Sequence, residues 1–185
     1  MSKLYVLIAE GTEEVECLTT VDLLRRAGVE VCLVSITDSL TVNTSHNVLV
    51  TADKIFADCD FTDGDALFVP GGVPGVPNLT ACEAVLDLIR SYNNAGKLIS
   101  AVCAGPSVLG AAGILEGKKA TCFPGWEDKL TGASYTAAGV TVDGNIITRR
   151  GLGFSIDLGL TIISYMVDEA TALDIKTRIQ HPETI

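Results

Sequence analysis

Apolar residues along this chain gather in short runs separated by segments of helical spacing. The run over 3–9 (KLYVLIA) is apolar almost throughout, and similar runs cover 29–36, 66–70 and 98–102. Continuous runs of this length are typical of strands that are buried on both faces of a parallel sheet. The pattern therefore predicts four central strands.

The segments between these runs predict helices. Residues 13–27 carry apolar side chains at helical spacing, and Gly28 follows where a C-terminal cap belongs. The predicted buried face of this helix consists of Val15, Leu18, Val21, Leu24 and Ala27. Further helices are predicted over 81–94, 104–112, 156–166 and 170–180.

Two hairpins complete the expected elements. Short strands at 41–42 and 47–51 flank a group of turn residues, and 139–149 contains alternating runs around Asp143-Gly144. Strands that alternate with helices indicate an α/β fold, in which helices cover both faces of a mostly parallel sheet. The length of 185 residues and the lack of a linker predict one domain over 1–185.

The charge of the chain argues against nucleic acid as a partner. It has 13 basic and 23 acidic residues, and a surface with this net charge of −10 repels phosphate backbones. An uncharged stretch over 98–115 is about as long as a membrane span. Pro106 and several small residues interrupt it, which favours a buried strand, a turn and a helix. We therefore expect no membrane partner either.

The six cysteines do not form a metal-binding pattern. They are Cys17, Cys32, Cys59, Cys82, Cys103 and Cys122, with no C-x-x-C and no histidine at ligand spacing from a cysteine pair. No secretory signal precedes the first strand. We expect a cytoplasmic protein with reduced thiols and with neither a metal nor a cofactor.

Cys103 stands in a context that favours a reactive thiol. It follows the strand at 98–102, and Ala101 and Gly105 complete the small-x-nucleophile-x-small pattern of a nucleophile elbow. Bulky side chains at those two places would collide with the strand or the helix. The following helix N-terminus, with Pro106 in its first turn, is expected to favour the thiolate. The alternative is an ordinary buried cysteine at a strand–helix connection.

Glycines end another predicted strand. Gly71-Gly72 follow the run at 66–70, and glycine allows backbone amides to approach a reacting carbonyl or oxyanion. The carboxyl ends of parallel strands meet at one edge of the sheet, where ligands bind. We therefore expect Gly71, Gly72 and Ala104 to offer backbone groups to a substrate beside Cys103. A simple tight turn is the alternative.

Three glutamates open the first predicted helix. Glu13, Glu14 and Glu16 would all complement the helix dipole there. One of them could instead point at Cys103, where a partly desolvated carboxyl would stay protonated and donate a hydrogen bond to the thiolate. Position along the chain does not choose among the three.

Four motifs occur in order along the chain, at 10–16 (EGTEEVE), 21–28 (VDLLRRAG), 69–72 (VPGG) and 100–106 (SAVCAGP). Together they closely resemble the ThiJ/PfpI family, in its DJ-one branch of parkinsonism-associated protein deglycases. The resemblance runs from the first strand to Gly153. It implies a flavodoxin-like three-layer sandwich and a homodimer. It also implies a nucleophilic, oxidation-prone Cys103, with Glu16 as its buried carboxyl partner and Gly72 beside the sulfur.

The resemblance also implies activities. Those of the family are conversion of methylglyoxal to lactate, deglycation of early adducts on protein amines, and redox-regulated chaperoning. The expected partners are therefore small reactive carbonyls or glycated protein amines, handled without a cofactor. A non-catalytic redox sensor or oxidative-stress chaperone that uses oxidation of Cys103 is the alternative, because it needs the same thiol.

The chain departs from the family near the cysteine. The family's animal branch has a histidine where this chain has Phe123, so proton transfer would fall to Glu16. His46 stands where the family often has an arginine near the dimer interface. Cys122 is a second thiol in this region, either a resolving cysteine for Cys103 or a packed core thiol.

A glutamine amidotransferase is a further alternative. His181 and Glu183 lie in Gln-His-Pro-Glu, which is similar to the His-Pro-Glu of the class I enzymes, and Cys103 would complete a triad. The position of this motif at the end of the chain and the AVCAG form of the elbow argue against it.

Overall fold

A seven-stranded sheet forms the centre of the protein, in the computed structural model that describes residues 2–184. Its strand order is β10-β11-β7-β6-β1-β2-β5. The strands are β1 (Lys3–Ile8), β2 (Glu30–Ser35), β5 (Lys54–Ile55), β6 (Ala66–Val69), β7 (Leu98–Val102), β10 (Val140–Asp143) and β11 (Ile146–Arg149). All neighbours pair in parallel except β10 and β11, which form the predicted hairpin. The four predicted central strands are confirmed as β1, β2, β6 and β7.

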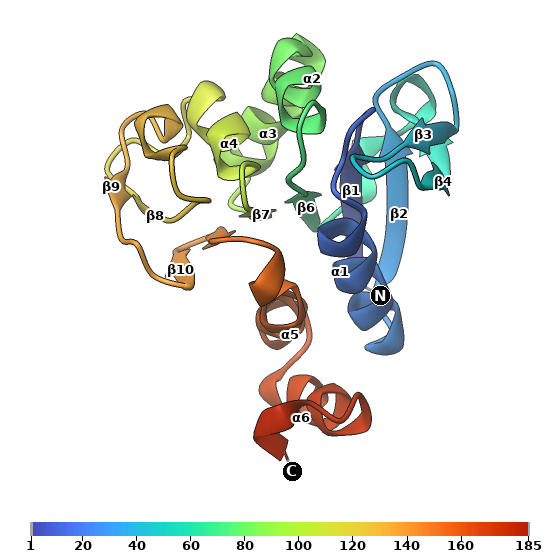
Figure 1. The fold of residues 1–185 in the computed structure, drawn as a ribbon, viewed down its shortest axis with the longest axis vertical. Helices are drawn as coiled ribbons and strands as arrows, with labels where there is room; N and C mark the ends of the chain where they lie inside the picture. Colours follow the sequence, from blue (N-terminus) through green and yellow to red (C-terminus); the bar gives the residue numbers. More distant parts are fainter. Residues whose placement is uncertain (1, 185) are drawn as a thin grey trace.

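Helices cover both faces of the sheet (Figure 1). They are α1 (Glu14–Arg26), α2 (Gly75–Ala81), α3 (Glu83–Asn94), α4 (Pro106–Ala111), α5 (Ser155–Met166) and α6 (Glu169–Arg178). In Figure 1, α2, α3 and α4 lie above the sheet, and α1, α5 and α6 lie below it. This is the predicted sandwich of helices, sheet and helices.

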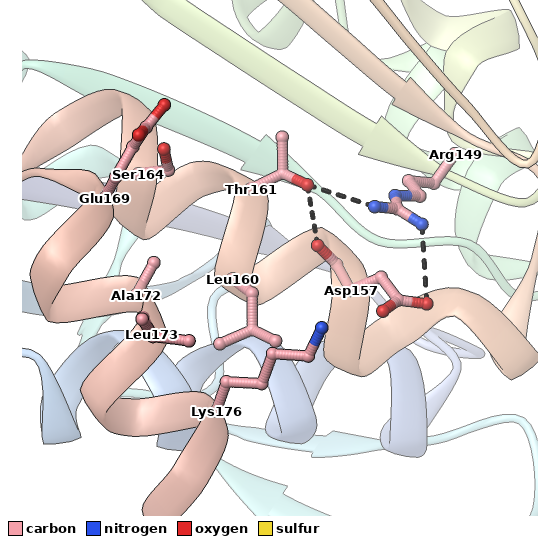
Figure 2. Close-up of a pocket in the computed structure, with 9 residues that line it drawn as sticks. All are labelled: Arg149, Asp157, Leu160, Thr161, Ser164, Glu169, Ala172, Leu173 and Lys176. Atoms are coloured by element: carbon pink, nitrogen blue, oxygen red, sulfur yellow. Dashed lines mark hydrogen bonds and ion pairs between the residues drawn. The ribbon is translucent and has the colours of Figure 1, made fainter. Parts of the chain in front are cut away.

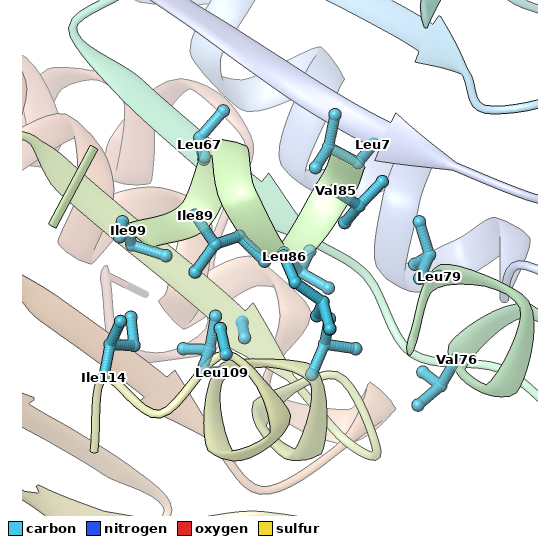
Figure 3. Close-up of a cluster of buried hydrophobic side chains, with 14 of the residues drawn as sticks. Leu7, Leu67, Val76, Leu79, Val85, Leu86, Ile89, Ile99, Leu109 and Ile114 are labelled. Atoms are coloured by element: carbon cyan, nitrogen blue, oxygen red, sulfur yellow. The ribbon is translucent and has the colours of Figure 1, made fainter. Parts of the chain in front are cut away.

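Strand side chains alternate between two buried clusters, one on each face. Leu7, Leu67 and Ile99 point to the face of α3 and α4, where they pack with Ile89 and Leu109 (Figure 3). The neighbouring strand positions supply the other cluster. Its members include Leu4, Val6 and Phe68 from the strands with Leu24, Leu158 and Ile175 from the helices. Strands buried on both faces explain the continuous apolar runs in the sequence.

Smaller elements lie outside the central sheet. The predicted hairpin at 41–51 is present as β3 (Thr41–Asn43) and β4 (Leu49–Thr51), which pair antiparallel. The pattern did not predict β5, α2, β8 (Lys119–Ala120) or β9 (Ser134–Tyr135), which are too short to show a period. Single turns of 3-10 helix occur at Phe56–Asp58, Phe61–Asp63, Glu127–Lys129, Leu152–Phe154 and Pro182–Thr184.

The buried face predicted for α1 is partly wrong. Val15 and Leu18 are exposed, whereas Cys17, Thr20 and Leu23 are buried. The helix packs against α5, and Leu23 approaches the place where a Cβ on Gly159 would stand. The face of α1 that packs on α5 therefore includes Leu23 rather than Val15 and Leu18.

Two other expectations are confirmed. The helix predicted over 81–94 is α3, which begins two residues later than predicted because Cys82 has an extended backbone after α2. The uncharged stretch over 98–115 is indeed a strand, a turn and a helix. Among residues 2–184, none of the helices is both long enough and apolar enough to span a bilayer.

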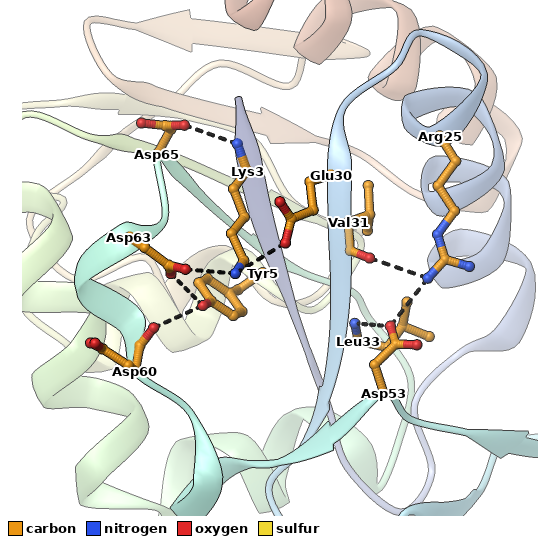
Figure 4. Close-up of polar contacts among 10 residues, drawn as sticks. All are labelled: Lys3, Tyr5, Arg25, Glu30, Val31, Leu33, Asp53, Asp60, Asp63 and Asp65. Carbon is orange, nitrogen blue, oxygen red and sulfur yellow. Dashed lines mark hydrogen bonds and ion pairs between the residues drawn. The ribbon is translucent and has the colours of Figure 1, made fainter. Parts of the chain in front are cut away.

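Polar contacts close the amino end of β1 (Figure 4). Lys3 Nζ lies 2.7 Å from Asp63 Oδ2 and 3.1 Å from Glu30 Oε1. The Tyr5 hydroxyl donates to Asp63 Oδ1 at 2.6 Å and contacts the Asp60 carbonyl oxygen at 2.8 Å. Side chains from β1 and β2 are thus tied to the segment that leads into β6.

Candidate functional site

Three strand ends meet at the carboxyl edge of the sheet, as the sequence predicts. Strands β1, β6 and β7 are neighbours there. The Glu13 amide donates to the Gly71 carbonyl at 2.9 Å, which joins the start of α1 to the end of β6. The Gly71 amide in turn donates to Glu16 Oε2 at 3.0 Å. Cys103 follows β7 and completes the group.

Cys103 occupies a sharp turn with a strained backbone. Its φ is +60°, which a non-glycine residue seldom adopts. The Cys103 amide donates to the Arg149 carbonyl at 3.0 Å, and this bond ties the turn to β11. A Cβ on Gly105 would lie 2.6 Å from the Val69 carbonyl oxygen, so only glycine fits there. The geometry is that of a nucleophile elbow, with a partly exposed side chain.

Gly71 separates the carboxyl group from the thiol. A Cβ on Gly71 would stand 2.4 Å from Glu16 Oε2 and 2.7 Å from Cys103 Cβ. These two side chains therefore face each other across a space that glycine leaves open. Gly72 is also required, since its φ is +102° and a Cβ there would lie 2.3 Å from the Glu13 amide nitrogen.

The three glutamates have different surroundings. Glu16 is 1% exposed and lies beside Cys103. Glu13 caps α1, because its Oε2 accepts from the Glu16 amide at 2.6 Å. Glu14 turns to the β3–β4 hairpin, where its Oε2 accepts from Ser45 Oγ at 3.2 Å. The carboxyl beside the thiol is thus that of Glu16, and the other two point elsewhere.

The electrostatics of the pair favour a thiol over a thiolate. Burial raises the pKa of Glu16 to about 7, although a hydrogen bond with Cys103 lowers it. Burial and then the charge of Glu16 raise the pKa of Cys103 to about 12. The Ala104 amide acts in the opposite direction. The amide at the start of the following helix thus acts in the direction expected from the sequence, but burial and the charge of Glu16 outweigh it.

The backbone groups predicted to meet a substrate differ in availability. The Gly71 amide is already bonded to Glu16, so it positions the carboxyl. The Gly72 amide has no hydrogen-bond partner within residues 2–184. The Ala104 amide points at the Cys103 sulfur. The Ala104 amide therefore acts on the thiol itself, whereas Gly72 packs against the segment that leads into α1.

The residues that differ from the family pattern lie around this edge. The Phe123 amide donates to the Cys103 carbonyl at 2.8 Å, and its exposed ring lies against Gly151. Phe123, Leu152 and Phe154 help to line a hollow of about 320 Å³. Cys122 is a fully buried core thiol that packs on the α3–α4 face, whereas Cys103 packs towards the other face. The packed-core interpretation of Cys122 therefore fits the structure.

The structure places His181 and Glu183 with partners on α5 and α6. His181 Nε2 lies 3.6 Å from Asp157 Oδ1, and Glu183 pairs with Lys176. Asp157 and Lys176 line a pocket of about 390 Å³ between α5 and α6, together with Arg149 (Figure 2). These contacts engage both residues away from the thiol and remove the basis for an amidotransferase triad.

One group of side chains within residues 2–184 has the spacing of metal ligands. It consists of Glu13, Glu14 and His46, whose ligand atoms lie within 4.8 Å of one another. His46 Nδ1 lies 3.0 Å from Glu14 Oε1. The sequence did not reveal this group, because its members come from two segments about thirty residues apart.

An elbow cysteine beside a buried carboxyl, on a flavodoxin-like sandwich, defines a class of thiol proteins. Residues 2–165 match the model of the DJ-1/PfpI family, so the chain belongs to that family. It is 35% identical to the Parkinson disease protein 7 homolog of Danio rerio, over 92% of this chain and 93% of that protein. It is 32% identical to the Glutathione-independent glyoxalase DJR-1.2 of Caenorhabditis elegans, over 88% of this chain and 87% of that protein.

Solved structures agree with the fold. A DJ-1 superfamily protein from Salmonella typhimurium superimposes with a TM-score of 0.94 at 33% identity, over 98% of this chain and 100% of that one. The chain spans only 40% and 44% of the length of two Arabidopsis thaliana relatives, Protein DJ-1 homologs B and A.

Proposed function

We propose that this protein converts small reactive carbonyls by glyoxalase-type chemistry, with Cys103 as the nucleophile and Glu16 as the acid and base. The observation that carries the proposal is the pair itself, a strained partly exposed thiol facing a buried carboxyl across Gly71. The pKa of Glu16, at about 7, suits a group that takes and returns protons near neutral pH. The relative named as a glutathione-independent glyoxalase supports the same chemistry.

The first proposed step joins the thiol to the aldehyde. The Cys103 sulfur attacks the aldehyde carbon of methylglyoxal while its proton passes to the Glu16 carboxylate. A carbon–sulfur bond forms, the carbonyl π bond breaks, and the aldehyde oxygen becomes an alkoxide. In this proposal the amides of Gly72 and Ala104 would stabilise that oxygen. The Glu16 carboxyl then returns its proton to give a hemithioacetal.

The second proposed step moves a hydrogen between the two substrate carbons. Glu16 removes the proton from the former aldehyde carbon, which leaves an enediolate, and delivers it to the neighbouring carbon, while the hydroxyl proton passes from the first carbon's oxygen to the second carbon's oxygen. The product is a lactoyl thioester of Cys103. Water then cleaves the carbon–sulfur bond, which releases lactate and restores the thiol. The balance is methylglyoxal plus water to lactate, without an external oxidant or reductant.

Phe123 makes Glu16 the sole proton carrier in this proposal. A phenyl ring transfers no proton, and the Phe123 backbone amide already binds the Cys103 carbonyl. Glycated protein amines as substrates and a homodimer remain predictions from the family resemblance. A cytoplasmic location and a single domain over 1–185 remain predictions from the sequence pattern and the chain length.

Lactate formation tests the proposal. The reduced protein is incubated with methylglyoxal, and lactate is measured by proton NMR beside Cys103→Ser and Glu16→Gln. We expect both variants to lose activity, by roughly a thousandfold or more for the nucleophile. Cys59→Ser is the matched control, because Cys59 is also a partly exposed free thiol but lies away from the carboxyl edge. Activity that survives in Cys103→Ser contradicts the proposed nucleophile.

A redox sensor is the second candidate, and the partial exposure of Cys103 favours it. Its signature would be rapid oxidation of Cys103 by peroxide in a protein that forms no lactate. Mass spectrometry of the peptide that contains Cys103, after brief treatment with peroxide, distinguishes the two candidates when it is combined with the lactate assay.

A further inference from the structure

Three large apolar side chains gather at the surface beside the cysteine turn. Phe123 is 48% exposed, Leu152 46% and Phe154 37%, and together they line the hollow of about 320 Å³. Among the described residues of its lining, Arg150 has the only charged side chain. Small-molecule pockets have volumes of about 300–1,000 Å³ and mostly apolar walls. The hollow therefore has the size and the lining of a site for a small apolar group.

Hydrogen bonds join both walls of the hollow to Cys103. On one side, the Phe123 amide donates to the Cys103 carbonyl at 2.8 Å. On the other side, the Cys103 amide donates to the Arg149 carbonyl at 3.0 Å, and Arg150 and Gly151 follow directly along the chain. The fold therefore places the hollow against the turn that carries the partly exposed Cys103 thiol.

The two aromatic walls are set by contacts with glycines. A Cβ on Gly151 would lie 3.3 Å from Phe123 Cδ2, so the Phe123 ring rests against the backbone at Gly151. A Cβ on Gly139 would lie 2.8 Å from Phe154 Cε1, and the Phe154 amide donates to the Gly151 carbonyl at 2.9 Å. Both rings thus have fixed neighbours, which makes the hollow a part of the fold.

The charged group of the lining is engaged by backbone oxygens. Arg150 Nη1 donates to the Ala137 carbonyl at 3.3 Å, and the Arg150 amide donates to the Gly139 carbonyl at 3.2 Å. The net charge of the chain, −10, also disfavours an anionic ligand. Two aromatic faces instead favour an uncharged ring, because aromatic pairs attract each other beyond the effect of the area they bury.

We propose that the hollow binds the substituent of the carbonyl substrate, and that aromatic 2-oxoaldehydes, represented by phenylglyoxal, react better than methylglyoxal. The inference rests on the proposed glyoxalase chemistry and specifies its substrate. A methyl group fills little of a hollow of about 320 Å³, whereas a phenyl ring contacts its aromatic walls. The steps are those given above, and phenylglyoxal plus water yields mandelate without an external oxidant or reductant. Phe123 and Leu152 then determine the choice of substrate.

Initial rates with the two substrates test this proposal in the full, reduced protein. Lactate from methylglyoxal and mandelate from phenylglyoxal are measured by chromatography, and the rates of Cys103→Ser are subtracted as background. One methylene in an apolar pocket changes kcat/KM by about 10–200-fold. We therefore expect kcat/KM for phenylglyoxal to exceed that for methylglyoxal at least about tenfold. Equal values for the two substrates overturn the proposal.

Variants assign the preference to the hollow. Phe123→Ala and Leu152→Ala should each lower the ratio of the two kcat/KM values about tenfold, mainly through a higher KM for phenylglyoxal. Leu173→Ala is the matched control, since Leu173 is an exposed leucine on α6, and should keep the wild-type ratio. Melting curves show that each variant is folded. A ratio that is unchanged in both variants overturns the proposal. So does an altered oligomeric state at unchanged ratio, which would assign the hollow to an interface between chains.

Alkylation of Cys103 tests the hollow without turnover. Phenacyl chloride and chloroacetone each form a carbon–sulfur bond with the thiol, chloride leaves, and the thiol proton passes to solvent. Both rates are followed by mass spectrometry of the Cys103 peptide and divided by the rates with N-acetylcysteine. Wild type should favour phenacyl chloride at least about tenfold, and Phe123→Ala should lose most of that preference. This preference without lactate or mandelate would refute the proposed function and support the hollow. Lactate formation without any preference for the aromatic reagents would do the reverse.

Discussion

The polar groups at the two ends of β1 have opposite surroundings. At the amino end, the largely buried Lys3 and Tyr5 pair with the exposed Asp63, and each polar atom meets a group of complementary character (Figure 4). At the carboxyl end, Glu16 is deeply buried, and no cation among residues 2–184 pairs with it. Its neighbour Cys103 has a backbone conformation that is itself strained.

The different surroundings of the two carboxyl groups shift their pKa values in opposite directions. At the amino end, the hydrogen bond from Lys3 lowers the pKa of Asp63, so the charged carboxylate stabilises the fold. At the carboxyl end, burial raises the pKa of Glu16, so its charge opposes folding. Groups whose ionisation is opposed by the fold are typical of functional sites. One end of the strand holds the fold together, and the other retains unfavourable charge and strain at the proposed reaction site.

The largest effect is expected from Glu16→Gln. The pKa of Glu16 is about 7 in the folded protein against a reference value of 4.5. The folded state therefore binds the proton more tightly than the unfolded state does, and stability falls as pH rises from 4.5 through 7. The neutral amide avoids this loss, which amounts to about 3 kcal/mol above pH 7.

Urea unfolding at two pH values measures this effect. Glu16→Gln should be more stable than wild type at pH 8, and that advantage should largely vanish at pH 4.5. The amide oxygen of glutamine can still accept from the Gly71 amide, so the comparison isolates the charge. A stability difference that is the same at both pH values would show that burial does not oppose ionisation here.

Gly71→Ala should be the next most damaging change. The new methyl group would overlap Glu16 Oε2 and Cys103 Cβ, and relief of such overpacking costs about 2 kcal/mol. It would also push the two side chains apart, so lactate formation should fall with stability. Gly153→Ala is the control for stability, since a Cβ there meets open space. Equal melting temperatures for the two variants would contradict the close approach at Gly71.

Tyr5→Phe tests the amino end. The variant loses a hydroxyl that bonds to Asp63 Oδ1 and contacts the Asp60 carbonyl, and we expect a loss of about 1 kcal/mol in unfolding free energy. Thermal unfolding at neutral pH gives the value. Lactate formation below the melting transition should not change, because the opposite end of β1 carries the proposed chemistry. A large loss of lactate formation in the folded variant would contradict the claim that the amino end of β1 takes no part in the proposed chemistry.

The smallest effect is expected from Arg25→Ala. Arg25 pairs with Asp53 at 3.1 Å, and both side chains are about half exposed. Such pairs contribute a few tenths of a kcal/mol and are screened by salt. The unfolding free energy of the variant should be lower than that of wild type by a few tenths of a kcal/mol in low salt. In high salt this difference between the two proteins should shrink further. A decrease in unfolding free energy of more than about 1 kcal/mol in Arg25→Ala would contradict the prediction, because an exposed ion pair does not contribute that much.

Much of the fold follows from local pattern. The four buried strands and the turn at Cys103 were predicted because strong apolar runs and steric demands act over a few residues. The buried face of α1 was mispredicted in part, because the side of α1 that meets α5 depends on packing between helices far apart in the sequence. Elements of two or three residues, such as β5, show no period at all.

The site was predictable only in part. Sequence position placed Glu13, Glu14 and Glu16 near Cys103 but did not choose among them, because the choice depends on how α1 enters from β1. The use of the Gly71 amide by Glu16 also depends on packing across two strands. The net pKa of Cys103 could not be predicted from the sequence, because burial is a property of the folded chain and outweighs the Ala104 amide.

The pairing of Cys103 with Glu16 is tested most directly by the pH dependence of Cys103 alkylation. Iodoacetamide modification is followed by mass spectrometry from pH 5 to pH 10 in wild type and Glu16→Gln. If the Glu16 carboxylate takes the thiol proton, the wild-type rate should show an inflection near its pKa of about 7, and Glu16→Gln should lack it. Superimposable profiles for the two proteins would contradict a functional pair at this edge of the sheet.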